Sequence, residues 1–94
     1  MNNIEQLSNF LVRVTSDGNL SPSHISICTA LCSAWIESGF CNPFNVSRSG
    51  LMTAAKIKST STYHKILSEL MKSKYVEYKP SYHPIKGSEI LILI

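Results

Sequence analysis

Residues 59–70 read STSTYHKILSEL, in which four small hydroxyl side chains lead into a helical repeat. On a helical wheel of about 100° per residue, one side collects the apolar residues Tyr63, Ile66, Leu67, Leu70 and Met71. The opposite side carries only serines and lysines, at positions 61, 65, 68 and 72. The stretch therefore predicts a helix with one buried face and an outer face of small polar and basic side chains.

An outer face of this kind suits contact with DNA. Small side chains let a helix backbone approach the duplex closely, and hydroxyl groups donate to phosphates or base edges. The helix N-terminus adds free N–H groups and a partial positive charge, and Lys65 and Lys72 add attraction to phosphates. Each residue alone is also explained as a cap or a solvated lysine, so the prediction depends on the combination.

Residues before this helix predict three further helices and one short strand. The first helix takes its pattern from the apolar stripe Ile4, Leu7, Leu11 and Val14, with Phe10 beside it. Ser47 suits the N-cap of the third helix. Ser21 suits an N-cap with Pro22 at the first helical position, and Gly39 suits the end of that helix. The apolar residues of this second helix cover more than one stripe, which predicts a central, buried helix. The predicted elements are helices over 3–15, 22–38 and 48–56 and a strand over 44–46.

Residues after this helix predict a β-hairpin. Positions 75–79 alternate aromatic or aliphatic with charged side chains, which is typical of a strand. Two prolines and a glycine make 80–88 a loop, and residues 89–94 read as a second strand that pairs back on the first. Lys79, His83 and Lys86 cluster around this loop, and Pro80 and Pro84 stiffen it. We expect the loop to act as a wing that lies along a neighbouring groove or the DNA backbone.

The order of these elements predicts a fold of the α+β class, mainly α. The expected architecture is a winged helix-turn-helix with about four helices, one short strand and a C-terminal β-hairpin wing. The 94 residues are enough for a single small domain. Within it, residues 1–19 form an N-terminal helix and residues 20–94 form the winged helix-turn-helix.

The charge is divided unevenly along the chain. Residues 1–47 carry one base and three acids, a net charge of −2, whereas residues 48–94 carry eight bases and three acids, a net charge of +5. Together these give the overall charge of +3. A one-sided distribution favours a polyanion as partner of the C-terminal half, while a solvated surface with chance asymmetry is the alternative.

The three cysteines, at positions 28, 32 and 41, predict buried structural thiols. Their spacing matches no recognised zinc site, so we expect no metal and no cofactor. Paired carboxylates, a Cys–His–Asp arrangement and a glycine-rich phosphate loop are all missing from the sequence, which argues against an enzyme.

Two segments, LSPSHISICTALCSAWIESGFCNPFNVSRSGLM (20–52) and KIKSTSTYHKILSELMKSKYVEYKPSYHPIKGSEILI (56–92), carry a family resemblance. They resemble the small winged helix-turn-helix proteins of bacterial mobile genetic elements, such as conjugative transposons. The pattern TYHK…EL…KYVEY.PS..P.KGS is the most specific part. The resemblance implies a transcriptional regulator or accessory DNA-binding protein, with 59–65 opening the recognition helix and 79–86 in the wing. It also implies a more distant likeness to the N-terminal winged helices of replication-initiation proteins.

One residue departs from this pattern, because Lys58 stands where we expect a glycine in the turn and adds a base on the DNA side. The predicted partner is double-stranded DNA, and the expected location is the cytoplasm, in association with the nucleoid. The predicted contacts are Arg48, Lys58, Ser59, Thr60, Ser61, Thr62, His64, Lys65, Ser68, Lys79, His83 and Lys86.

A protein-interaction module without DNA contact is the alternative function. The run Ile90–Ile94 is apolar on both faces of a predicted edge strand, so something has to cover its second face. The first helix, a second copy of the chain or residues outside it would serve. A homodimer through this edge or through the N-terminal helix is therefore also predicted.

Overall fold

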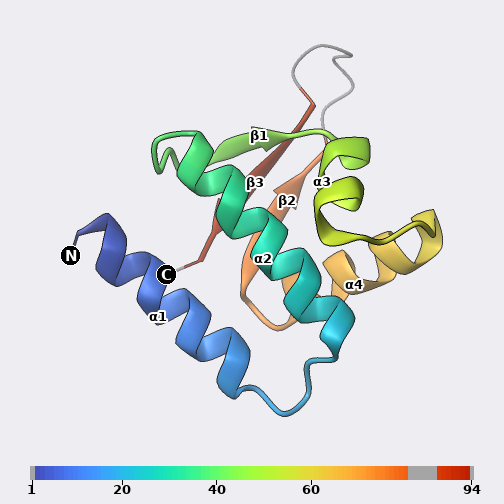
Figure 1. The fold of residues 1–94 in the computed structure, drawn as a ribbon, viewed down its shortest axis with the longest axis horizontal. Coiled ribbons are helices and arrows are strands. Elements are labelled where there is room, and N and C mark those ends of the chain that lie inside the picture. The colour runs from blue at the N-terminus through green and yellow to red at the C-terminus, as the bar shows by residue number, and fades with distance from the viewer. Residues whose placement is uncertain (1, 81–86, 94) are drawn as a thin grey trace.

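The computed structural model of the chain describes residues 2–80 and 87–93. Four helices and three strands follow one another in this part of the chain (Figure 1). They are α1 Asn3–Ser16, α2 Pro22–Glu37, β1 Phe44–Val46, α3 Arg48–Ala55, α4 Thr60–Lys72, β2 Val76–Lys79 and β3 Ser88–Ile92. The predicted elements are confirmed in type and order, with small shifts at their ends.

Serine N-caps begin three of the helices, as local sequence predicts. Ser21, Ser47 and Ser59 each accept a hydrogen bond at Oγ from the backbone N–H three residues further on. Within α3, Gly50 donates this bond to Ser47, and a Cβ added at Gly50 would lie 2.7 Å from the same Oγ. Glycine at this position lowers helix propensity but leaves room for the cap.

One antiparallel sheet contains the three strands in the order β1-β3-β2. β3 pairs with β2 in the predicted hairpin and, on its other side, with β1, where Phe44 lies opposite Ile90. The side chain of Asn42 extends this second pairing, because it donates to the carbonyl of Ile92 and accepts from the Ile92 N–H, both at 2.9 Å.

The prediction that residues 90–94 form an edge strand is therefore wrong over the described part of that run. The distant β1 segment covers the second edge, and β3 is the central strand of the sheet. Ile90 and Ile92 are buried on the inner face, while Leu91 is half-buried on the outer face. A central position explains the strand's apolar character without a second copy of the chain.

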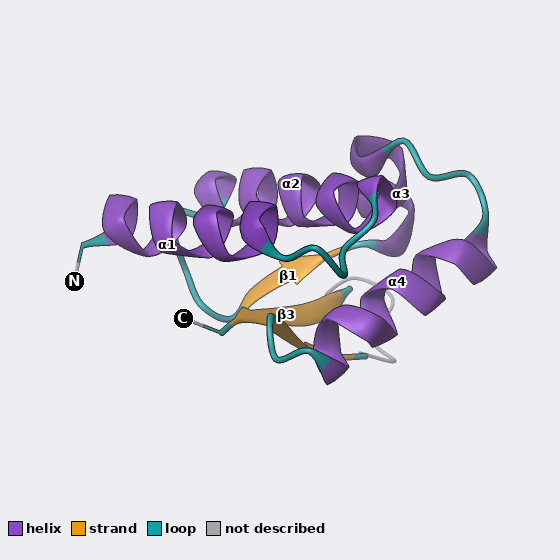
Figure 2. Ribbon diagram, turned by 90° about the horizontal axis from the view of Figure 1, so that it is seen from below, coloured by secondary structure: helices purple, strands orange, loops and turns teal. Residues whose placement is uncertain are grey.

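Helices α1 and α2 lie side by side along one face of the sheet (Figure 2). The core between the helices and the sheet includes twelve large side chains that each expose about 2 % of their surface or less. These are Trp35, Tyr63, Phe10, Ile27, Leu31, Leu67, Leu70, Ile90, Ile92, Val14, Val76 and Cys28. Every element except α3 and β1 contributes to this set, and those two elements add Leu51, Ala55 and Phe44 to the same buried cluster, so the described elements share a single core.

Arg13 fixes α1 to the far end of the hairpin. Its Nη1 donates to the carbonyl of Leu93 at 3.0 Å, and its Nη2 donates to the carbonyl of Lys74 at 3.3 Å. The guanidinium also lies 4.6 Å from the centre of the Tyr75 ring, which meets Phe10 edge-on. The Tyr75 hydroxyl in turn donates to Asp17 at 2.6 Å, just after the end of α1.

The residues that α1 buries differ from those that the sequence predicts. Phe10 and Val14 are buried, whereas Ile4 is 67 % exposed and Leu11 is 37 % exposed. The stripe predicted from Ile4, Leu7, Leu11 and Val14 is therefore wrong in two of its four members. Because Phe10 packs edge-on against Tyr75, α1 buries the face around Phe10 and Val14 rather than the whole aliphatic stripe.

Two smaller predictions about burial are also wrong. Met71 is 37 % exposed rather than inward-facing, because α4 buries a narrower face around Leu70 and Leu67. Cys28 and Cys32 are buried thiols as predicted, but Cys41 is exposed in the segment between α2 and β1.

The helices α2, α3 and α4, followed by the hairpin of a three-stranded antiparallel sheet, make up a winged helix-turn-helix. The predicted fold class, α+β and mainly α, is confirmed, and α1 is an addition at the N-terminal side. No helix in residues 2–80 and 87–93 is long and apolar enough to cross a membrane.

Buried thiol and phenol groups in this core make the stability of the fold decrease at alkaline pH. Burial raises the pKa of the Cys28 thiol from 9.0 to about 12, and Cys32 adds a smaller electrostatic effect. Burial also raises the pKa of Cys32 to about 11 and that of the Tyr63 hydroxyl from 10.0 to about 12. These groups stay protonated in the folded chain at pH values where the unfolded chain has already released the proton.

We therefore expect the free energy of unfolding to fall as the pH rises above 9.0, the ordinary thiol pKa. Below that pH the contribution is fully present; above it, each such group lowers the free energy by up to about 1.4 kcal/mol per pH unit. Urea titrations between pH 9.0 and about 12 should give a shallower fall of the unfolding free energy with pH for Cys28→Ala than for the parent. Equal slopes for the parent and Cys28→Ala would contradict this assignment.

Candidate nucleic-acid interface

The outer face of α4 presents the small polar side chains that the sequence predicts. Ser59 accepts from the Thr62 N–H at 3.2 Å and shares a hydrogen bond with Ser61, Oγ to Oγ, at 3.0 Å. Thr60 is exposed beside them, while Thr62 is half-buried. Because Ser59 and Ser61 are bonded locally and exposed, the helix opens with hydroxyls that are ordered and accessible to a ligand.

Further along α4, His64, Lys65 and Ser68 are exposed, as are Met71 and Lys72 in its last turn. The His64 ring lies edge-on to Tyr63, with 5.2 Å between ring centres. Tyr63 is itself fully buried and anchors the first turn of α4 in the core. The helix is therefore held firmly from within while its polar side chains remain free outside.

Glu69, the single acid of α4, is turned away from this face. Its Oε1 lies 2.9 Å from Nε2 of His24, a buried residue of α2. His24 completes a capping box, because its Nδ1 accepts from the Ser21 N–H at 3.0 Å. Since Nδ1 accepts a hydrogen bond, the neutral ring carries its proton on Nε2, and this N–H donates a hydrogen bond to Glu69. The carboxylate closest to the outer face thus has a partner inside the fold, a feature that sequence spacing did not reveal.

The turn between α3 and α4 differs from the prediction. The left-handed residue is Lys56, with φ of 61° and ψ of 32°, rather than the position of Lys58. The N–H of Ile57 donates to the carbonyl of Met52 at 3.0 Å, and the N–H of Lys56 donates to that of Thr53 at 3.2 Å. This pair of bonds is the Schellman arrangement that ends a helix, so the place where glycine is favoured lies two residues earlier than expected.

A basic groove runs between α3 and the start of α4. This hollow of about 570 Å³ is lined by Arg48, Ser49, Met52, Thr53, Lys56, Ile57, Lys58 and Thr60. The structure therefore brings together the predicted contacts Arg48, Lys58 and Thr60 and adds Lys56, which sequence reasoning missed. Lys56 was predicted only as part of the helix over 48–56 and the turn that follows it, although its charge close to Lys58 was a visible signal.

The predicted wing is described in part. Lys79 is exposed at the end of β2, directly opposite Glu89 of β3, and it borders a hollow that Glu77 also lines. Two carboxylates therefore surround this lysine, which weakens its attraction for phosphate compared with the prediction. His83 and Lys86 lie outside the described residues.

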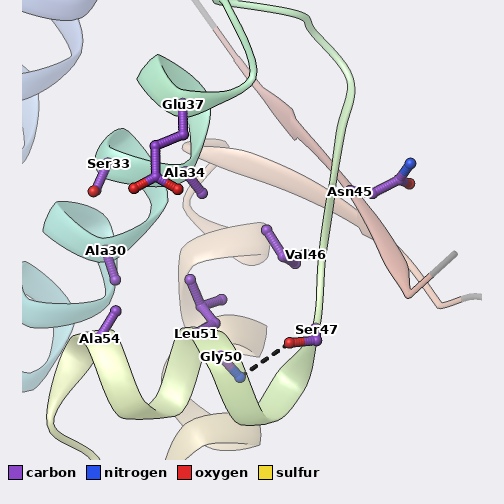
Figure 3. A pocket seen from close by; sticks show the side chains of 10 residues that line it. All are labelled: Ala30, Ser33, Ala34, Glu37, Asn45, Val46, Ser47, Gly50, Leu51 and Ala54. Atoms are coloured by element: carbon purple, nitrogen blue, oxygen red, sulfur yellow. Dashed lines mark hydrogen bonds between the residues drawn. The ribbon is translucent and has the colours of Figure 1, made fainter. Parts of the chain in front are cut away.

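A third hollow in the described part of the chain, of about 240 Å³, lies between α2 and α3 (Figure 3). Ala30 of α2 and Ala54 of α3 point toward one another across it, and small side chains make up most of its lining. Glu37 is the single ionisable residue in that lining.

Comparison with known proteins identifies no relative of this chain. The chain matches no protein-family model, no curated protein and no solved structure. Function therefore has to be argued from the residues and their arrangement.

Proposed function

We propose that this protein binds double-stranded DNA as a transcriptional regulator or an accessory DNA-binding factor. In the proposed complex, α4 enters the major groove with its N-terminal half, and the β2–β3 hairpin lies on the neighbouring backbone or groove. Phosphate contacts from lysines would supply most of the affinity, and the hydroxyls of α4 would contact phosphates or base edges.

One observation carries this proposal: the exposed face of α4 and the adjoining groove hold bases and hydroxyls without a free carboxylate. Arg48, Lys58 and Lys65 are all exposed, and in residues 2–80 and 87–93 the one carboxylate within 4.0 Å of a basic side chain is that of Glu69, beside His24. Unpaired cations beside a helix N-terminus attract an anionic backbone.

The test is binding to a labelled mixed-sequence duplex at about 50 and about 200 mM salt. We expect the parent to bind at low salt and to lose affinity by orders of magnitude at high salt. Lys65→Ala should weaken binding several-fold and lower the slope of log affinity against log salt by about 1. A parent that binds no duplex at low salt would refute the proposal.

A protein-interaction module is the second candidate, and one observation favours it. Large apolar side chains are exposed on α1 and α2, with Ile4 at 67 %, Val12 at 60 % and Ile36 at 47 %. Exposed apolar residues of this size are typical of contact surfaces. Failure of duplex binding, together with self-association that Ile4→Ser and Val12→Ser abolish, would favour this candidate over the first.

A further inference from the structure

The basic groove between α3 and α4 is built around a residue in an unfavourable backbone conformation. Lys56 has a φ of 61°, a left-handed conformation that costs a residue with a side chain more than it costs glycine. Ser26 holds the preceding residue, because its hydroxyl donates to the carbonyl of Ala55. With the two backbone bonds of the Schellman turn, this contact fixes the conformation of Lys56.

The same turn recurs at the ends of α2 and α4 and provides a comparison inside the chain. After α2 the left-handed position is Gly39, whose N–H donates to the carbonyl of Ile36 at 3.0 Å. After α4 it is Lys74, with φ of 64°, and its N–H donates to Met71 at 3.1 Å. Backbone strain alone therefore does not single out Lys56, since Lys74 has it as well.

What separates the two lysines is their surroundings. Lys56 lines the groove together with Arg48 and Lys58, so three cations border one hollow. Within the described ranges 2–80 and 87–93, no carboxylate lies within 4.0 Å of any of these three cationic groups. Lys74 lies at the opposite end of α4, where its carbonyl accepts from Arg13.

We propose that the α3–α4 groove is a phosphate site, and that Lys56 binds the phosphate together with Arg48 and Lys58. The phosphate is a phosphodiester of the nucleic-acid backbone, so this inference rests on the proposed function. Three like charges around one hollow repel one another unless an anion lies between them. Hydroxyls of Ser49, Thr53 and Thr60 in the lining add donors for phosphate oxygens.

Comparison of Lys56→Gly with Lys74→Gly tests this site, because both changes remove one charge and relieve the same strain. We expect each variant to melt about 4–8 °C higher than the parent, since glycine suits both turns. Duplex binding should fall about 5- to 10-fold in Lys56→Gly and stay within about twofold in Lys74→Gly. Lys56→Arg, which keeps the charge, should retain the affinity of the parent.

The outcomes separate this inference from the proposed function. If the parent binds duplex and Lys65→Ala weakens it, but Lys56→Gly and Lys74→Gly bind equally, the groove is not a phosphate site and the proposed function stands. If the parent binds no duplex, the proposed function fails, and so does a site for the backbone phosphodiester. Millimolar inorganic phosphate at constant ionic strength distinguishes the source of the phosphate. If it protects the Lys56–Thr60 amides from hydrogen exchange in a parent that binds no duplex, the groove binds free phosphate instead of the backbone phosphodiester.

Discussion

Replacing Gly87 with alanine is expected to destabilise the domain by about 2–4 kcal/mol, more than a methyl group added at any of the other three glycines. Gly87 precedes β3 and has a φ of 68°. A Cβ at this position would lie 2.5 Å from the carbonyl oxygen of Val46 and 3.1 Å from its carbonyl carbon. Both atoms belong to the backbone of β1, so no side-chain rotation relieves the clash, and the pairing of Val46 with Ser88 has to open.

Thermal melting checks this expectation, with a drop of roughly 10–25 °C for a domain of this size. Gly18→Ala is the matched control, because nothing lies within 4 Å of the position that its Cβ would occupy. The control should change the melting temperature by no more than a few degrees. A Gly87→Ala variant that melts with the parent would show that β1 does not approach β3 so closely in solution.

Reversing two charges at the candidate interface should have the largest effect on binding. In Lys58→Glu/Lys65→Glu, one carboxylate enters the basic groove and the other enters the outer face of α4. Each replaces attraction to phosphate with repulsion, so we expect the affinity for duplex at low salt to fall by about 100-fold or more.

Lys72→Glu/Lys74→Glu is the control for this loss, because it changes the net charge equally at the C-terminal end of α4, away from the N-terminal half that enters the groove in the proposed complex. This variant should lose no more than about tenfold in affinity, through weaker long-range steering. Circular dichroism and melting temperature should match the parent in both variants, since all four lysines are exposed. Equal losses in the two variants would mean that net charge, rather than the predicted interface, governs binding.

Elements with local signals were predictable from the sequence. The serine caps at 21 and 47 and the helical repeat around Tyr63 each depend on residues within one or two turns, and the structure confirms them. The hairpin was predictable for the same reason, because alternation and a loop of prolines and glycine are read from neighbouring residues.

Contacts between distant segments were not predictable in this way. The pairing of β1 with β3 depends on a three-residue strand that has no pattern of its own, so β3 was mistaken for an edge. The buried face of α1 depends on Tyr75, which lies beyond four intervening elements. At the candidate site, the partner of Glu69 was hidden for the same reason, because His24 lies 45 residues away.

The two carbonyls that Arg13 binds belong to different parts of the proposed interface. Lys74 follows α4, and Leu93 follows β3, so a single guanidinium holds the end of the helix and the end of the hairpin at a fixed separation. Any sliding of one against the other would break one of these bonds. In the proposed complex, α4 and the hairpin would thus meet the duplex as one preorganised body, and little conformational entropy would be lost on association.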